Sequence, residues 1–540
     1  MLNILMPKQT VKPAFYNRLT NRGERDGGSF DAKIAANGNS ISKVFAEKNV
    51  PYLLTNSKPY CKIRVRIIIV ILFCALLSSC ASNIAYYANL DGLAANQRFS
   101  DAAKLTQTSK DKYYGDKNAL LYCLDIGFFL HTAGDYEESN KYFEKAKELF
   151  DYFFTKSITT EASTWLISDN TRPYYGEDFE RVLVNIFSAI NYTMLGKMQD
   201  ALVEARQADQ FLTSLQTKYG YKNVYKEDAF ARYFLGMLYE NNGERNDAYI
   251  SYFKALKAYE KNGKYYNFAI PAELIISCKR LAYKLGFADD LKDINEKYQN
   301  IPRASSETPL ASGQSSNMGE LVVINYNGLA PKKVETIFEI SFGNAWLYVN
   351  ANEINSQDEE QVEKAGSIAR SIFAQEQVRM AFPKYENSNY TIETMELGLE
   401  SSALEPKKAV LADDIGEIAK VSLDDKITRI RAKTIARAAI KFALAHEISA
   451  KVAENNGETG GFLSKIAMAV ASTLTEKADR RSWRVLPDKI LISTIALPEG
   501  KNSVILTFRD KYGNKVYQKT INDIQIMHNK KTFYIVRTAQ

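Results

Sequence analysis

The feature that most constrains the fold is one pattern of small and large residues that occurs three times between residues 127 and 255. Each copy is centred on a glycine (Gly134, Gly196 or Gly243) and has a small residue seven positions before it and a large one four before it. Further small residues follow five and twelve positions later. Glycine lets a chain reverse at a helix end, and small residues let two helices approach closely, so the pattern predicts antiparallel helix pairs. The small positions are Gly127, Ala189 and Gly236, then Ser139, Ala201 and Ala248, then Ala146, Ala208 and Ala255.

Two weaker copies turn near Gln97 and at Gly286, so we expect helical repeats over residues 80–300. The pattern resembles the tetratricopeptide repeat (TPR). Successive turns are 37, 62, 47 and 43 residues apart, whereas tandem copies of that repeat are about 34 apart. The extra residues, Asp151–Gly176 and Thr213–Lys226, are expected to lengthen helices or to add loops. An ordinary all-helical bundle with a similar period is the alternative.

The resemblance to the TPR family implies a concave surface, lined by the first helix of each pair, that binds a protein partner. Tyrosines are frequent nearby, where they serve either as interface anchors or as packing between repeats. The family's groove positions give nine candidate partner-binding residues in this chain. They are Phe128, His131 and Thr132, then Ile190, Thr193 and Met194, then Met237, Glu240 and Asn241.

The composition changes after the helical region. Residues 301–318 are rich in Ser, Pro and Gly without a period, which predicts a flexible linker. Residues 319–488 contain predicted strands and two predicted helices, Asp425–Ala453 and Phe462–Thr475, so we expect a mixed α+β domain. Residues 489–540 contain strands and turns and resemble a small β-sandwich. The predicted fold class is thus an all-α TPR-like solenoid followed by an α+β domain with a β-rich end. The predicted strands are Leu321–Tyr326, Glu335–Ser341, Ala345–Val349, Val378–Phe382, Tyr390–Leu397, Lys489–Ile495, Ser503–Phe508, Val516–Ile521 and Thr532–Arg537.

The apolar run Ile67–Leu77 predicts an export signal, because basic residues precede it and small residues follow it. Its 11 residues are about half of what a membrane-spanning helix needs, which is roughly 20. The run continues into Leu77, Ser78, Ser79 and Cys80, which resembles the lipobox of bacterial lipoproteins. Residues 62–79 would then be a signal peptide. Residues 1–61 would be a non-globular extension or a stretch translated from too early a start.

The lipobox resemblance implies that Cys80 carries lipid and tethers the mature chain to a membrane. In that family an Asp after the cysteine retains a protein in the inner membrane, and here that position is Ala81. The expected location is therefore the outer membrane, facing the periplasm. The whole chain after Cys80 also resembles a sparsely characterised family of bacterial TPR lipoproteins, through the segments Ala436–Lys441 and Asp479–Pro487. That resemblance implies a place in the cell envelope and no established chemistry.

The segment around Trp483 is the most distinctive local cluster of the C-terminal half. Two interpretations stay open. It is either an internal cluster of salt bridges and cation–π contacts, or an exposed docking patch, because Trp and Arg are frequent at interface hot spots. Its residues are Asp479, Arg480, Arg481, Trp483 and Arg484.

Charge and cysteines exclude two classes of protein. Residues 1–66 carry 12 Lys and Arg against 4 Asp and Glu, so a charge of +8 lies in the part that processing would remove, and the rest of the chain, at a total of +7, has 7 − 8 = −1. The remaining chain is almost neutral, which argues against a nucleic-acid partner. Cys123 and Cys278 remain in the mature chain, where two buried thiols are a simpler expectation than a disulfide framework.

No sequence motif indicates an enzyme. His131, His446 and His528 are not at metal-ligand spacing, and no nucleophile elbow, phosphate loop or dinucleotide fingerprint occurs. We therefore predict no catalytic residue, metal or cofactor. The acidic pairs Asp413–Asp414 and Asp424–Asp425 lie at predicted helix starts. The resulting hypothesis is a lipid-anchored scaffold that binds unknown envelope proteins. The alternatives are an enzyme acting on cell-wall or carbohydrate material, and a structural subunit of an envelope machine.

Overall fold

The computed structural model describes residues 85–160, 172–218, 225, 227–266, 269–301, 317–341, 377–399, 405–438 and 477–540. Within the chain, Ser82–Gln540 is one compact unit. The N-terminal extension, the predicted signal with Cys80 and most of the linker lie outside the described residues. The predicted strand Ala345–Val349 and the predicted helix Phe462–Thr475 lie outside them too.

Paired helices form the first part of the described chain, and they reverse at the five predicted turns. Gln97, Gly134, Gly196, Gly243 and Gly286 all have φ between 57° and 86°, the left-handed region in which glycine is favoured. Within the described residues, no helix is both long and apolar enough to cross a membrane. The helices are 85–95, α3 (Phe99–Thr108), the π-helix η1 (Lys110–Tyr114), the 3-10 helix η2 (Asp116–Asn118), α4 (Ala119–Ala133), α5 (Tyr136–Thr160), α6 (Asp178–Met194), α7 (Met198–Lys218), α8 (Ala229–Asn242), α9 (Arg245–Tyr266), α10 (Ala272–Leu285) and α11 (Ala288–Lys297).

The paired helices are as close as the small residues allow. A Cβ atom on Gly127 of α4 would lie 2.7 Å from Cε1 of Phe143 on α5, and one on Gly236 of α8 would lie 2.5 Å from Cε1 of Tyr252 on α9. Residues beyond the basic repeat lengthen helices, as predicted, because α5 has 25 residues and α7 has 21. The TPR-like solenoid is therefore confirmed by the chain's own helix pairs.

The strands of the described residues form two four-stranded sheets and one two-stranded ribbon. The first sheet has the order β10-β1-β7-β6 and the second has the order β5-β4-β8-β9, while β2 and β3 form the ribbon. β1 is parallel to β10 and antiparallel to β7. The strands are β1 (Met318–Asn327), β2 (Lys332–Ser341), β3 (Gln377–Glu386), β4 (Ile392–Leu399), β5 (Lys407–Lys408), β6 (Val410–Asp414), β7 (Lys489–Pro498), β8 (Gly500–Asp510), β9 (Lys515–Ile526) and β10 (Lys531–Thr538).

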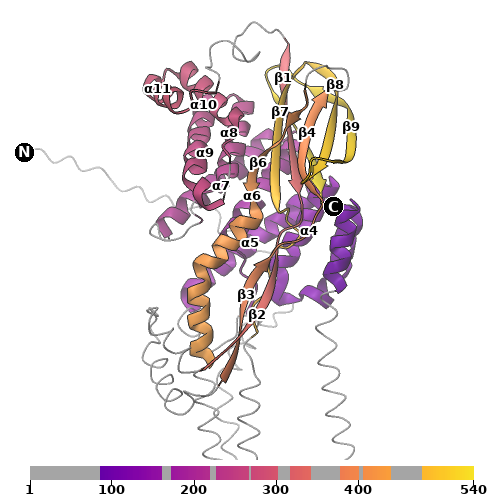
Figure 1. Cartoon of the computed structure of the whole chain (residues 1–540), viewed down its shortest axis with the longest axis vertical. Helices are drawn as coiled ribbons and strands as arrows, with labels where there is room; N and C mark the ends of the chain where they lie inside the picture. The colour runs from indigo at the N-terminus through magenta and orange to yellow at the C-terminus, as the bar shows by residue number, and fades with distance from the viewer. Residues whose placement is uncertain are drawn as a thin grey trace, which may run out of the picture. The chain divides into compact units, whose positions relative to one another are not determined.

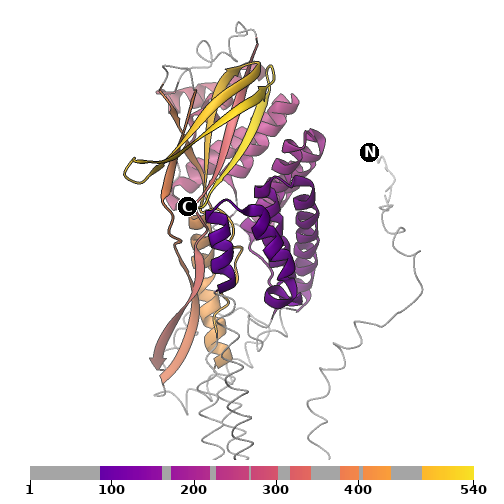
Figure 2. The ribbon, with the colours of Figure 1, turned by 90° about the vertical axis from the view of Figure 1, so that its right-hand side faces the viewer.

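β1 is buried on both of its faces. Leu321 and Val323 belong to the core between the two four-stranded sheets. Val322, Ile324 and Tyr326 point the other way and belong to the core shared with the helices. Burial on both faces explains the nearly unbroken apolar run of this strand. Figures 1 and 2 show the helices on one side of these strands.

Two features differ from the sequence-based prediction, namely the pairing of the C-terminal strands and the start of one helix. The predicted β-sandwich of residues 489–540 is instead built with strands from 319–488, since β7 and β10 pair with β1 and β8 pairs with β4. The helix expected from Asp425 begins ten residues earlier, at Ile415, and is described as far as residue 438 (orange in Figure 1). Asp414 Oδ1 accepts the backbone N–H of Glu417 (2.9 Å) and so caps this earlier start.

Candidate functional site

The predicted partner groove is occupied by the protein's own first sheet. Phe128 of α4 lies against Tyr326 of β1, with ring centroids 5.9 Å apart. Phe128, Ile190 and Met237 are at most 2% exposed. This corrects the expectation of a groove open to another protein. The physical reason is that β1 has a second apolar face, and the concave side of the helices buries it.

His131 joins the helices to the sheet through both ring nitrogens. Its Nδ1 lies 2.5 Å from Asn191 Oδ1, and its Nε2 lies 3.0 Å from the hydroxyl of Tyr326. Asn191 Nδ2 donates to Ser139 Oγ (2.9 Å), which orients its oxygen toward the imidazole. Since an amide oxygen only accepts, Nδ1 carries the proton and Nε2 accepts from Tyr326. Burial lowers the pKa of His131 to about 4, so the ring is neutral at pH 7.

Asn241 imitates one rung of a β-ladder at the other end of the groove. Its Oδ1 accepts the backbone N–H of Lys531 (2.8 Å) and its Nδ2 donates to the Lys531 carbonyl (3.2 Å). Glu240, the preceding residue, lies 3.4 Å from Lys531 Nζ and also pairs with Arg280. Burial raises the pKa of Glu240, but these two cations outweigh it and hold the pKa at about 2. An ionised, paired carboxylate therefore holds the first residue of β10 against α8.

The remaining predicted groove residues are Thr132, Thr193 and Met194, and all three are partly buried. The hydroxyl of Thr132 donates to the Phe128 carbonyl (3.0 Å), and that of Thr193 donates to the Ala189 carbonyl (2.8 Å). The first bond lies within α4 and the second within α6. These side chains thus support the helices that carry the groove.

Trp483 lies inside the protein, at the centre of an aromatic cluster. It is 1% exposed, and its ring centroid is 6.1 Å from that of Phe128 and 5.9 Å from that of Phe187. Its backbone N–H donates to Glu180 Oε1 (3.0 Å). Burial, with the charge of Glu177 next, raises the pKa of Glu180 to about 7. Trp483 is therefore a contact between the C-terminal half and the helices, and it is not available to an external partner.

The charged residues around Trp483 also bind within the chain. Arg481 forms a salt bridge with Asp479 (2.7 Å). Arg484 binds Asp91 (2.7 Å) of the first described helix. Arg480 is exposed. Of the two interpretations left open by the sequence, the contacts of Arg481 and Arg484 match the internal cluster.

Three carboxylates, Asp228, Asp413 and Asp414, lie where α8 meets β6. Asp228 caps α8 by accepting the N–H of Ala231 (2.7 Å) and also accepts the hydroxyl of Tyr225 (2.9 Å). Asp413, on β6, is 2% exposed, and burial followed by the charge of Asp228 raises its pKa well above the usual range. Burial raises the pKa of Asp414 to about 6. Among the described residues, no group of three or more His, Cys, Asp or Glu is arranged to hold a metal ion. The thiols of Cys123 and Cys278 are buried and free.

Sequence reasoning missed the partners of the groove, above all Tyr326 and Lys531. A signal for Tyr326 existed, because the run Leu321–Tyr326 is apolar without the alternation of a half-exposed strand. Such a run needs cover on both faces, and the helices supply it on one of them. No comparable signal singled out Lys531.

No protein-family model and no curated protein matches this chain. Among solved structures, MamA of AMB-1 aligns at 14% identity and a TM-score of 0.25, over 42% of this chain and 95% of its own. Two structures of the nearly identical TPR-like repeats of a Podosopora anserina kinesin light chain align at 13% identity. Their TM-scores are 0.27 and 0.26, over 40% and 43% of this chain and 92% and 96% of theirs. At these scores the alignments add nothing to the helix pairs and turns described above, which carry the TPR-like assignment alone.

Proposed function

We propose that this protein is a lipid-anchored scaffold of the bacterial cell envelope that binds other envelope proteins. Cys80 is the proposed lipid attachment site, and the supporting observation is the signal-like run that ends in Leu77, Ser78, Ser79 and Cys80. The proposed location is the outer membrane, facing the periplasm. The role requires no catalytic chemistry and no cofactor.

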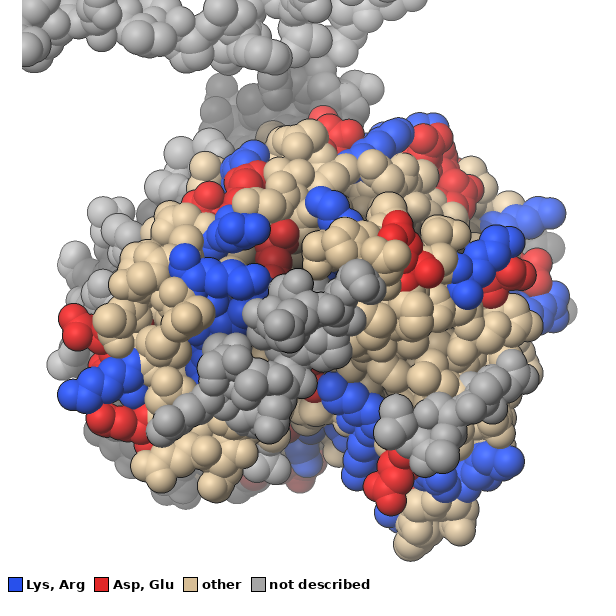
Figure 3. All heavy atoms as spheres, turned by 90° about the horizontal axis from the view of Figure 1, so that it is seen from above, with Lys and Arg blue, Asp and Glu red and all other residues tan. Residues whose placement is uncertain are grey.

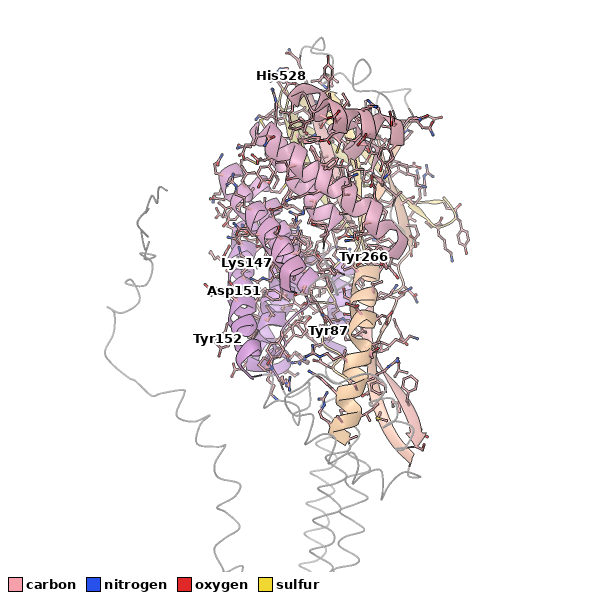
Figure 4. The ribbon with its side chains drawn as sticks, turned by 90° about the vertical axis from the view of Figure 1, so that its left-hand side faces the viewer. Tyr87, Lys147, Asp151, Tyr152, Tyr266 and His528 are labelled. Atoms are coloured by element: carbon pink, nitrogen blue, oxygen red, sulfur yellow. The ribbon has the colours of Figure 1, made fainter. Side chains whose placement is uncertain are left out.

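The observation that carries the scaffold role is the stack of TPR-like helix pairs, whose second helices α5, α7 and α9 keep exposed apolar side chains. The filled groove moves the proposed partner surface to these second helices. Each presents a large apolar side chain to solvent: Tyr152 on α5 is 54% exposed, Val203 on α7 is 48% and Ile250 on α9 is 43%. Tyr152 lies at the edge of the helices, beyond Lys147 and Asp151 of the same helix (Figure 4). We expect partner proteins to contact this side.

Two experiments test the two parts of the proposal. The lipid anchor predicts that cells incorporate labelled palmitate into the wild type and not into Cys80→Ser, which leaves the membrane fraction. A Cys80→Ser protein that stays in the membrane fraction would refute the anchor.

The partner surface is tested by photo-crosslinking in intact cells. A crosslinking amino acid at Val203 or Ile250 is expected to capture discrete proteins. The control position is Tyr512 in the turn between β8 and β9, which is 77% exposed. If a crosslinker at Tyr512 captures as much protein as one at Val203 or Ile250, the proposed partner surface on the second helices is refuted. The proposed lipid anchor is not affected by that result.

A further inference from the structure

A chain of tyrosine rings fixes the first described helix, 85–95, against the helices that follow it (indigo in Figure 2). The ring of Tyr86 stacks on that of Tyr113 in η1, with centroids 4.1 Å apart, and its hydroxyl donates to the hydroxyl of Tyr114 (3.2 Å). The contacts continue from Tyr114 to Tyr122 of α4 (5.5 Å) and from Tyr122 to Tyr142 of α5 (5.9 Å). The five rings therefore join the start of the described chain to α4 and α5.

Three exposed lysines lie over these rings. Lys112 Nζ is 5.0 Å from the ring centroid of Tyr113, and Lys145 Nζ is 5.1 Å from that of Tyr142. Lys110 Nζ is 5.4 Å from the ring centroid of the α4 tyrosine. The two named tyrosines are partly buried, whereas all three lysines are exposed and form no salt bridge with any described residue. We call Lys110, Lys112, Lys145, Tyr113 and Tyr142 the tyrosine–lysine patch.

The surroundings of the patch carry an excess of positive charge. Residues 104–117 contain four lysines and two aspartates, and on α5 Glu148 follows Lys145 by one turn, so five lysines stand against three acids. The chain after residue 66 is close to neutral, so this excess is local. On the face of the molecule in Figure 3, basic and acidic side chains occur together. Packing accounts for the tyrosines, but it does not require three exposed lysines without acidic partners.

The patch lies close along the chain to the proposed lipid attachment site. Cys80 precedes Tyr86 by six residues, and six fully extended residues span at most about 22 Å. With the acyl chains of Cys80 in the bilayer, Tyr86 lies within that distance of the headgroups. The ring of Tyr113 is stacked on Tyr86, so the patch is held near the same membrane surface.

We propose that the tyrosine–lysine patch docks on the anionic phospholipid headgroups of the leaflet that holds Cys80. Tyrosine rings, which have an apolar body and a polar tip, are favoured at the level of the headgroups, and lysines extend from apolar surface toward their charges. Anionic lipids attract basic segments that lie beside a membrane anchor. Docking holds the folded body in one orientation instead of letting it swing on its tether. This contact rests on the lipid anchor of the proposed function.

Fluorescence quenching by lipid tests the docking. The full chain, purified from membranes as the cell processes it, is reconstituted in vesicles of phosphatidylcholine and phosphatidylglycerol that contain a lipid with a nitroxide on its headgroup. A fluorescent amino acid replaces Gln107, which is exposed on α3 near the patch, or Gln299, which is exposed just after α11. Figure 1 shows α11 at the opposite end of the stack from the indigo helices. We expect stronger quenching at Gln107 than at Gln299.

The variant Lys110→Gln/Lys112→Gln/Lys145→Gln should lose this difference. Each lysine near an anionic surface strengthens association roughly fivefold, so losing three lowers the ratio of docked to undocked protein by roughly a hundredfold. Raising the salt concentration from 0.1 M to 1 M should also reduce quenching at Gln107 in the wild type, because the Debye length falls from about 10 Å to about 3 Å. Lys110→Gln/Lys112→Gln is a milder variant with a smaller expected loss, should the triple variant fold poorly.

The matched control is Lys511→Gln/Lys515→Gln/Lys519→Gln, which removes the same charge from the region of β9. Two of these lysines also lie over tyrosine rings, at 4.9 Å and 5.8 Å. Quenching at Gln107 should stay as in the wild type.

The outcomes separate the patch from the anchor. A wild type that floats with the vesicles but is quenched equally at Gln107 and Gln299 would overturn the docking and leave the anchor intact. Equal losses in the two triple variants would overturn it as well. A wild type that does not float with the vesicles would refute the anchor and the docking together. Palmitate labelling reports on Cys80 independently of the quenching.

Discussion

Replacing Gly236 by Ala tests the claim that helix pairs touch through the small residues of the repeat. The new Cβ would lie 2.5 Å from Cε1 of the Tyr252 ring, and Tyr252 is fully buried. Overpacking of this kind destabilises a protein by about 1–3 kcal/mol. Displacing the ring also weakens the bond from the Tyr252 hydroxyl to Glu240 (2.8 Å), a charged hydrogen bond that contributes about 1.5–3 kcal/mol.

Helix propensity acts in the opposite direction, because Ala is favoured over Gly by about 1 kcal/mol. The expected net change is a loss of about 2–4 kcal/mol in the free energy of unfolding. The matched control is Gly92→Ala in helix 85–95, where no atom lies within 4 Å of the added Cβ. At this position only helix propensity acts, so the free energy of unfolding is expected to rise by about 0.5–1 kcal/mol.

Urea unfolding followed by circular dichroism measures both variants, with equal slopes as the check that the unfolded states are comparable. The free energy of unfolding is thus expected to fall in Gly236→Ala and to rise in Gly92→Ala, although both variants add the same methyl group. A Gly236→Ala protein as stable as the wild type, or two changes of equal sign, would show that α8 and α9 are not in close contact at this position.

The remaining predictions concern the junction between helices and sheet. For His131, the pKa of about 4 in the folded state lies below the usual 6.5, so its stabilising contribution is complete above pH 6.5 and falls by roughly 3 kcal/mol as the pH drops toward 4. His131→Gln should lack this pH-dependent part of the stability. If the free energy of unfolding falls equally in both proteins between pH 7 and pH 4.5, the prediction is contradicted. Trp483→Ala should destabilise by about 3–5 kcal/mol through a cavity, whereas Ala in place of the exposed Arg480 should change stability by less than about 0.5 kcal/mol. Similar urea midpoints for these two variants would refute the buried position of Trp483.

The turns of the repeats could be predicted because their cause is local. Gly134, Gly243 and Gly286 each sit where a helix must end in the left-handed region, and that requirement involves only adjacent residues. The spacing predicted either longer helices or added loops in these places, and α5 and α7 are the longer helices. Most of the described strands after residue 317 also followed from local composition, but β5 and β6 were not predicted, and Asp413 and Asp414, expected at a helix start, end β6.

The contents of the groove could not be predicted, because they depend on contacts between distant parts of the chain. Nothing near Asn241 indicates that its amide pairs with the backbone of Lys531. The family resemblance pointed to a partner protein at the same positions, and an intramolecular strand satisfies those side chains equally well. For Trp483 and its arginines, composition alone was compatible with both an internal cluster and a docking patch. Burial, which decides between them, is a property of the whole fold.

The covering of the groove by β1 and β10 also sets an order of events during synthesis. Asn241 and Lys531 are separated by 290 positions. At about 5–20 residues per second, the ribosome makes Asn241 roughly 15–60 s before Lys531, its partner on β10. Tyr326 of β1, which covers Phe128, is made well before β10, so the end of the groove at Asn241 is the part that waits longest for its cover.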